Sequence, residues 1–113
     1  MNKPEQKNIL EIGRRVISQE AAAVALLSDK IGDEFAAAVE LMLAAKGRVI
    51  VSGMGKSGHV AGKITATLAS TGTPAQFIHP AEASHGDLGM MTRADVALVL
   101  SNSGETPELA NLI

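Results

Sequence analysis

Cysteine, tryptophan and tyrosine are absent from this chain of 113 residues, and its aromatic side chains are two phenylalanines, Phe35 and Phe77. The lack of cysteine excludes disulfide bonds, thiolate metal sites and a cysteine nucleophile. The scarcity of aromatic rings leaves no platform on which nucleic-acid bases could stack. For the same reason, the core must be built from aliphatic side chains. A chain without cysteine suits a reducing compartment, and we expect a cytoplasmic location.

An excess of one charge is also lacking, because 10 lysine and arginine residues stand against 12 aspartate and glutamate residues and the net charge is −2. The two signs are interspersed, so the sequence has neither a basic footprint for nucleic acid nor a basic face for a membrane. No apolar run is long enough to span a bilayer, and the polar first residues lack the apolar stretch of a signal peptide. The hydrophobic content of 46% predicts a folded globular protein, and the charge pattern predicts no nucleic-acid or membrane partner.

Apolar spacing and turn residues predict an alternation of helices and strands. Helices are expected over residues 8–27, 33–45, 57–70 and 105–113, strands over residues 48–52, 75–79 and 95–101, and a long loop over residues 80–94. Asp33 can cap the second helix, and Gly47 can end it in the left-handed conformation. This order of elements predicts an α/β fold with a doubly wound parallel sheet.

The domain organisation follows from the same pattern. Residues 1–47 are expected to form an N-terminal helical segment, and residues 48–113 the first half of the α/β domain. A sheet of only three parallel strands would leave an apolar edge exposed. A compact small domain is the alternative, but typical domain sizes favour a truncated part of a longer domain.

The segment GMGKSGH follows the first predicted strand and contains two familiar phosphate-binding patterns. A Walker A loop needs a glycine separated by four residues from its Gly-Lys pair, and Ile50 occupies that position here, which excludes the pattern. The dinucleotide pattern G-x-G-x-x-G is complete, but the next predicted strand ends in His79 and Pro80 where a ribose-binding acid is required. Lys56 beside a helix N-terminus could still bind another anion. The alternative is a tight turn with a solvated lysine.

A second loop, LSNSGET, repeats the strand–loop–helix arrangement after the third predicted strand. It supplies the hydroxyls of Ser101, Ser103 and Thr106 and the amide of Asn102 around a glycine. A serine helix cap is the alternative, but a cap needs only one hydroxyl. In a parallel sheet both loops lie at the carboxyl ends of the strands, so the pair favours a small phosphorylated ligand over a dinucleotide.

The long predicted loop carries titratable groups to the same edge of the sheet. These are His79, Glu82, His85 and Asp87, and Glu105 stands at the start of the last predicted helix. Histidine and carboxylates beside a phosphate site suit proton transfer, because histidine titrates near neutral pH. Each of them could equally be a surface loop residue. A metal site at His79 is a further alternative, although no second histidine has helical ligand spacing.

The segments GMGKSGH, STGTP, HPAEASHGDLGM and SNSGE together resemble the sugar isomerase (SIS) domain and, within it, the arabinose-5-phosphate isomerase family. The resemblance extends from about Ile12 to the end of the chain. It implies a three-layer, doubly wound, flavodoxin-like α/β fold, here truncated and preceded by N-terminal helices. It also implies an isomerase that interconverts D-ribulose 5-phosphate and D-arabinose 5-phosphate through an enediol, supplying 3-deoxy-D-manno-octulosonate for lipopolysaccharide.

The resemblance further assigns roles to residues that match the family's motifs. Lys56, His85 and Glu105 correspond to residues that the family needs for catalysis. The implied substrate-binding residues are Gly55, Ser57, Gly72, Thr73, His79, His85, Ser101, Asn102, Ser103, Thr106 and Asn111. Relatives require no cofactor, although they can hold an inhibitory zinc ion at the position of His79.

The chain departs from the family's pattern in its length. Family members continue with further strands that carry a second catalytic glutamate and an SHPGG-type histidine, often followed by CBS modules, and neither motif occurs here. Whether this chain is active by itself therefore stays open. The resemblance implies a homo-oligomer, a tetramer in the intact family, with a sugar phosphate as ligand. A non-catalytic phosphosugar sensor is the alternative function.

Overall fold

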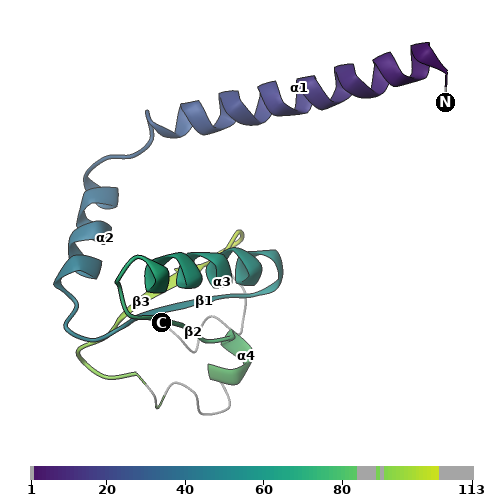
Figure 1. Ribbon diagram of the computed structural model, residues 1–113. Coiled ribbons are helices and arrows are strands. Elements are labelled where there is room, and N and C mark those ends of the chain that lie inside the picture. The colour runs from purple at the N-terminus through teal and green to yellow at the C-terminus, as the bar shows by residue number, and fades with distance from the viewer. Residues whose placement is uncertain (1, 84–88, 90, 105–113) are drawn as a thin grey trace. The chain divides into compact units, whose positions relative to one another are not determined.

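The computed structural model describes residues 2–83, 89 and 91–104 (Figure 1). In chain order its elements are α1 (Lys3–Leu27), α2 (Asp33–Ala44), β1 (Val49–Gly53), α3 (Gly55–Ser70), β2 (Ala75–Phe77), α4 (Pro80–Ala83) and β3 (Val96–Leu100). They belong to two compact units, Met1–Val39 and Glu40–Ile113. The helix predicted for residues 105–113 lies outside the described residues.

Helix α1 begins at Lys3, earlier than the start at residue 8 that the apolar spacing predicts. The cause is a reciprocal cap, in which the Glu5 N–H donates to Asn2 Oδ1 over 3.0 Å and the Asn2 N–H donates to the Glu5 carboxylate over 3.4 Å. Such a cap satisfies N–H groups that the helix itself leaves unpaired. The helix therefore extends into a polar segment in which hydrophobic periodicity gives no signal.

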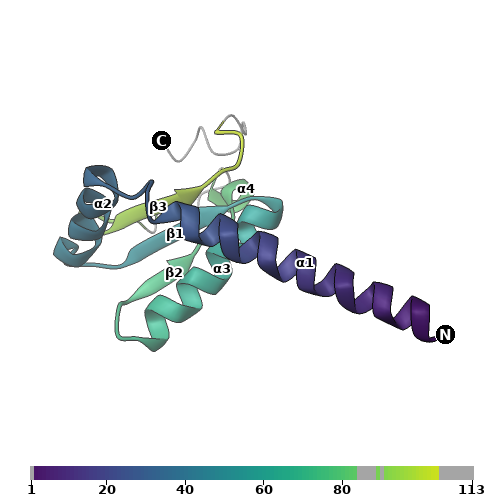
Figure 2. The same ribbon diagram turned by 90° about the horizontal axis from the view of Figure 1, so that it is seen from above.

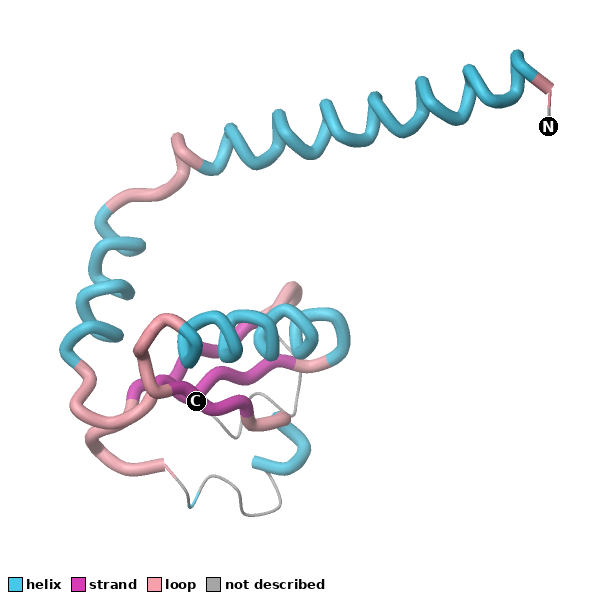
Figure 3. Tube along the Cα trace, in the orientation of Figure 1, coloured by secondary structure: helices cyan, strands magenta, loops and turns pink. Residues whose placement is uncertain are grey.

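The second unit is built on a three-stranded parallel sheet in the order β2-β1-β3. Val49 of β1 pairs with Ala75 of β2 on one side and with Val96 of β3 on the other. All residues of β1 are buried, as expected for a central strand with both faces covered. Figures 2 and 3 show the strands side by side, with α3 running along them. The predicted α/β fold with a doubly wound parallel sheet is confirmed.

The core lies on both faces of β1, and successive residues of the strand serve opposite faces. Val49 and Val51 pack with Ala61 of α3, and these three side chains are at most 1% exposed. Ile50 points to the other face and packs with Ile78 and Met91. The aliphatic core predicted from the scarcity of aromatic residues is thus formed by the buried strand.

Two predictions of local structure are wrong. The sequence predicts an irregular loop over residues 80–94, but Pro80–Ala83 form the short helix α4, which proline favours at its first position. The sequence also predicts a left-handed conformation at Gly47, whose φ is not positive. Gly47 is needed for packing instead, because a Cβ there would collide with Asp95 and lie 3.0 Å from the backbone of Ala94.

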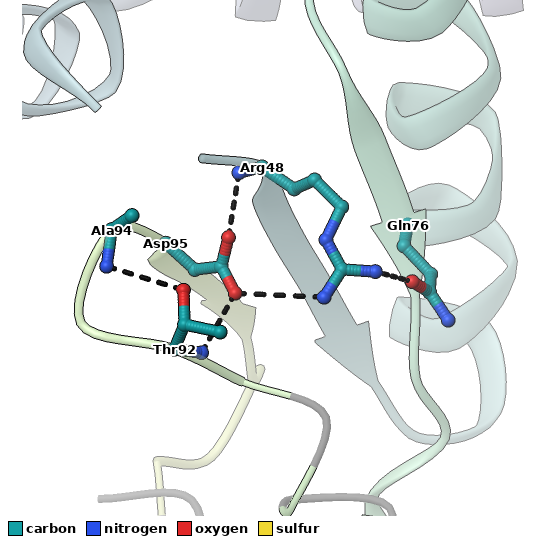
Figure 4. A network of polar contacts seen from close by, with 5 residues as sticks. All are labelled: Arg48, Gln76, Thr92, Ala94 and Asp95. Atoms are coloured by element: carbon teal, nitrogen blue, oxygen red, sulfur yellow. Dashed lines mark hydrogen bonds and ion pairs between the residues drawn. The ribbon is translucent and has the colours of Figure 1, made fainter. Parts of the chain in front are cut away.

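The amino ends of the strands are tied together by a polar network around Asp95, shown in Figure 4. The Asp95 carboxylate accepts hydrogen bonds from the backbone N–H groups of Arg48 (2.6 Å) and Thr92 (2.9 Å). The Arg48 guanidinium lies 3.5 Å from the same carboxylate and donates to the side chain of Gln76 in β2. The Asp95 side chain is 2% exposed, and Arg48 links this buried carboxylate, just before β3, to Gln76 of β2.

We expect the Asp95 network to make stability depend on pH. The backbone N–H of Arg48, and after it that of Thr92, hold the pKa of Asp95 below its ordinary value of 3.8, although burial opposes the shift. Because the folded-state pKa is the lower one, the charged carboxylate contributes its full stabilisation above pH 3.8, and this contribution is lost as the pH falls below 3.8 and through the lower folded-state pKa. Asp95→Asn should therefore melt at a lower temperature at pH 7, with a gap to the parent that narrows in acid.

Thermal unfolding of both proteins by circular dichroism between pH 7 and pH 3 measures this gap. Glu40→Gln is the matched control, because it removes an exposed carboxylate from the same unit. A gap that is constant across this pH range would contradict the role given to the Asp95 charge.

Candidate functional site

The register of the sheet brings three strand ends to one edge. Gly53, the last residue of β1, pairs with Leu100, the last residue of β3. On the other side Val51 pairs with Phe77, and the Ile78 N–H donates to the Val51 carbonyl over 2.9 Å. The segments that follow the three strands therefore leave the sheet at the same level, as the two predicted phosphate loops require.

The strand order places a topological switch point at this edge. The chain passes from β1 to β2 on one side of the sheet and then returns to β3 on the opposite side of β1. In open α/β sheets ligands bind in the crevice where the strand order reverses, beyond the carboxyl ends of the strands. The segments after β1 and β3, which carry Lys56 and Ser101, flank this point.

The three glycines at the junction of β1 and α3 have different structural roles. Gly53 and Gly58 let β1 and α3 approach, because a Cβ on Gly58 would lie 2.6 Å from the Gly53 carbonyl oxygen and a Cβ on Gly53 would lie 2.9 Å from the backbone of Ser57. Gly55 has a φ of +57°, which favours glycine, and open space where a Cβ would stand. The loop thus exposes its backbone to a ligand at Gly55 while the flanking glycines pack.

The first turn of α3 is suited to an anion. Its cap residue, Met54, makes no side-chain hydrogen bond, so the N–H groups at the start of the helix are not satisfied by a cap. These groups and the helix dipole together give a site for negative charge. Lys56 is exposed in this turn and Ser57 is half-buried beside it.

The second loop is a tight turn in which the Gly104 N–H donates to Ser101 Oγ over 2.8 Å. Gly104 has a φ of +73°, a conformation that glycine adopts without strain. Since Ser101 Oγ accepts this bond, its own O–H remains a donor for a further partner. Asn102 and Ser103 are exposed in the same turn. The described half of this loop therefore offers hydroxyl and amide groups beside the glycine loop.

His79 lies two residues after the end of β2 and directly before helix α4, which its ring caps. The Ala81 N–H donates to His79 Nδ1 over 3.1 Å. His79 also lines a pocket of about 250 Å³ together with Gly55, Gly58, His59 and Phe77. The structure thus brings the predicted residues Gly55 and His79 to one pocket.

His59 is a pocket residue that sequence reasoning missed. It stands four positions after Gly55 within α3, and residues at that spacing share one face of a helix. This spacing is the signal that could have identified it.

Gly72 and Thr73 do not lie with the other predicted residues. They connect the end of α3 to the start of β2, and the neighbouring Pro74 carbonyl accepts the N–H of Val49 at the start of β1 over 2.9 Å. They are therefore at the amino ends of the strands, the edge opposite Lys56 and Ser101. Their contact with substrate stays a prediction.

Several predicted residues lie outside the part of the chain that the structure describes: His85, Asp87, Glu105, Thr106 and Asn111. Their roles stay predictions. For zinc at His79, the described residues do not supply a binding set, since no group of three or more histidine or carboxylate side chains among them could hold a metal ion. The ring nitrogen Nδ1 of His79 is, moreover, occupied by Ala81.

The switch-point loops, the uncapped helix start and the glycine packing define an α/β domain with two polar loops at the carboxyl ends of its parallel strands. The SIS domain model matches residues 42–113, and the chain belongs to this family. In the described part of the chain, no helix is both long and apolar enough to cross a membrane.

Two bacterial isomerases are similar in sequence to nearly the whole chain. It is 58% identical over 113 residues to the arabinose 5-phosphate isomerase KdsD of Pseudomonas aeruginosa, covering 100% of this chain and 35% of that protein. It is 50% identical over 105 residues to the arabinose 5-phosphate isomerase GutQ of Escherichia coli K12, covering 93% of this chain and 33% of that protein. The chain thus spans about a third of the length of these relatives.

Solved structures share the fold. A protein of E. coli CFT073 in complex with arabinose 5-phosphate is 42% identical and superimposes with a TM-score of 0.87, covering 99% of this chain and 58% of that one. A putative phosphosugar isomerase from Bacteroides fragilis, described as involved in capsule formation, is also 42% identical, with a TM-score of 0.85, covering 92% of this chain and 55% of that one.

The contact between Gly53 and Gly58 leads to a paired prediction within α3. Gly58→Ala should destabilise the second unit by about 1–3 kcal/mol, because the new methyl group meets backbone that cannot move aside. Gly62→Ala, one turn later with nothing within 4 Å of a Cβ, should stabilise it by about 0.5–1 kcal/mol through helix propensity. Urea unfolding followed by circular dichroism measures both, and equal effects of the two substitutions would refute the packing role of Gly58.

Proposed function

We propose that this chain is the sugar-phosphate-binding part of an aldose–ketose isomerase that interconverts D-ribulose 5-phosphate and D-arabinose 5-phosphate. The observation that carries the proposal is the pair of polar loops at the switch point of an SIS fold, one of them opening an uncapped helix. The names of the similar isomerases and the arabinose 5-phosphate complex of a similar structure support the choice of sugar.

The phosphate is proposed to bind between the two loops. The N–H groups at the start of α3 and the Ser57 hydroxyl would meet it from one side, and Ser101, Asn102 and Ser103 from the other. Such a set of donors binds a dianion without a metal, because each phosphate oxygen accepts hydrogen bonds from backbone and hydroxyl groups. Thr106 and Asn111 are proposed to complete the contacts.

The reaction itself needs a base, an acid and stabilisation of an enediolate. Removal of the proton next to the carbonyl and its return to the neighbouring carbon moves hydrogen within one molecule, so we propose that no redox cofactor is required. Lys56 is proposed to stabilise the developing negative charge, with His85 and Glu105 as proton-transfer groups. Gly72 and Thr73 are proposed as substrate contacts on the resemblance alone, because the structure has them at the opposite edge of the sheet from the two loops.

The proposal includes the compartment of the reaction and the synthesis that uses its product. Arabinose 5-phosphate would be produced in the cytoplasm for 3-deoxy-D-manno-octulosonate and lipopolysaccharide synthesis. The absence of cysteine and the near-neutral charge of the chain are compatible with this compartment.

Ligand binding tests the proposal directly. Arabinose 5-phosphate should raise the melting temperature of the chain, whereas NAD should leave it unchanged. Lys56→Ala should weaken binding by roughly tenfold or more, since a hydrogen bond to a charged group contributes about 1.5–3 kcal/mol. Lys63→Ala, an exposed lysine later in α3, is the matched control and should bind like the parent.

Calorimetric titration measures these affinities, and an assay of ribulose 5-phosphate conversion measures turnover. Stabilisation by NAD alone would refute the proposed ligand. Turnover by the chain alone would show that it carries a complete active site, whereas binding without turnover would fit a part of the isomerase that binds the sugar phosphate.

We also propose that the chain forms a homo-oligomer through α1. This helix buries none of its residues, and its apolar side chains remain well exposed, among them Ile17 at 69% and Val24 at 67%. These two stand seven positions apart, two helical turns along one face. A helix face of this kind gains stability by burial against another helix.

Replacing Ile17 and Val24 together with lysine should shift the chain to a lower oligomeric state, because charges would then have to be buried in the interface. Sedimentation velocity measures the mass in solution. The matched control replaces the polar residues Gln19 and Glu20 of α1 with lysine, and an equal shift in that variant would speak against the apolar contact.

A further inference from the structure

His79 is joined to helix α4 by a bond that fixes the state of its ring. In the bond from Ala81 the backbone N–H is the donor, so His79 Nδ1 must accept with its lone pair. His79 takes the position just before the first residue of α4, and Ala81 is the second residue, the spacing of an N-terminal helix cap. A neutral ring that accepts at Nδ1 carries its proton on Nε2.

The Nε2 nitrogen is the one that remains for a ligand. His79 lines the pocket beside Gly55, and because its Nδ1 accepts from Ala81, the nitrogen that the ring has left for a ligand is Nε2, which carries the proton. The ligand opposite such a donor must offer an acceptor oxygen. Metal binding at Nε2 would require the reverse arrangement, in which Nε2 holds the lone pair and Nδ1–H donates to a second partner.

We propose that helix α4 fixes His79 as a neutral Nε2–H hydrogen-bond donor to an acceptor oxygen of the ligand in the pocket beside the glycine loop, and not as a metal ligand. This inference rests on the proposed function for the identity of the ligand, whereas the ring state does not depend on it. The Ala81 N–H is thus a positioning group, which acts on the ligand through His79. His59 of α3 lines the same pocket.

The ring state can be measured without any ligand. The chain contains three histidines, so long-range proton–nitrogen NMR spectra hold three imidazole patterns, and His79→Asn identifies that of residue 79. We expect the pattern of the Nε2–H form, unchanged when zinc is added. An Nδ1–H pattern, or a zinc-induced change at the Nε2 of His79, would overturn the proposal.

Two substitutions separate the cap from the donor. His79→Asn keeps an acceptor oxygen at the place of Nδ1 but has no donor at the place of Nε2, so it should melt like the parent and bind arabinose 5-phosphate roughly tenfold more weakly. His79→Gln offers an amide N–H near the place of Nε2 but lacks the cap, so it should melt at a lower temperature and recover most of the affinity. The opposite ranking of the two affinities would refute the donor role.

The same titrations with inorganic phosphate and with free arabinose identify the acceptor oxygen. Equal weakening of phosphate binding by His79→Asn assigns the donor to a phosphate oxygen, and weakening confined to the sugar assigns it to a sugar oxygen. Failure of the parent to bind arabinose 5-phosphate would count against the proposed function alone, because the NMR pattern of the ligand-free chain still decides the ring state.

Discussion

The parallel pairing of β1 with strands on both sides is the constraint on which the rest of the second unit depends. Because Gly53 is level with Leu100, and Ile78 bonds to the carbonyl of Val51, the segments after all three strands begin at one edge. A shift of one residue would also turn Val49 and Val51 away from Ala61, so the packing of the core and the position of the site are fixed by the same register. The Asp95 network secures this register from the opposite end.

The close packing of α3 on β1 fixes where the first turn of the helix lies relative to the end of the strand. Gly53 and Gly58 bring the first turn of the helix against the strand end, and the φ of +57° at Gly55 turns the chain between them. A longer loop could supply the same N–H groups, but it would lose conformational entropy when it bound an anion. Here the helix start is held by packing, so its donors are ordered before a ligand arrives.

Much of this could be predicted from the sequence, because the informative residues act locally. The VIVSG strand, the glycine loop and the SNSG turn are each recognised within a few positions, and parallel strands place their carboxyl ends together. Features that depend on contacts across the fold could not be predicted. The role of Gly47 was predicted wrongly because its close approach to Asp95 joins segments that are far apart in the sequence. Gly72 and Thr73 are predicted site residues that follow a helix rather than a strand, and their contact with substrate stays a prediction.

The end of β2 explains why a complete G-x-G-x-x-G pattern does not predict a dinucleotide site here. In dinucleotide-binding folds this strand end carries an acid, whose carboxylate accepts hydrogen bonds from the ribose hydroxyls. The chain has His79 at the corresponding edge, and with Nδ1 already accepting from Ala81 the ring can offer only a donor. A donor suits the oxygens of a phosphorylated sugar but leaves ribose hydroxyl protons without an acceptor. On the proposed function, the glycines would hold a phosphate in both kinds of protein, and the side chain beyond the second strand, here His79, would decide which ligand can occupy the site.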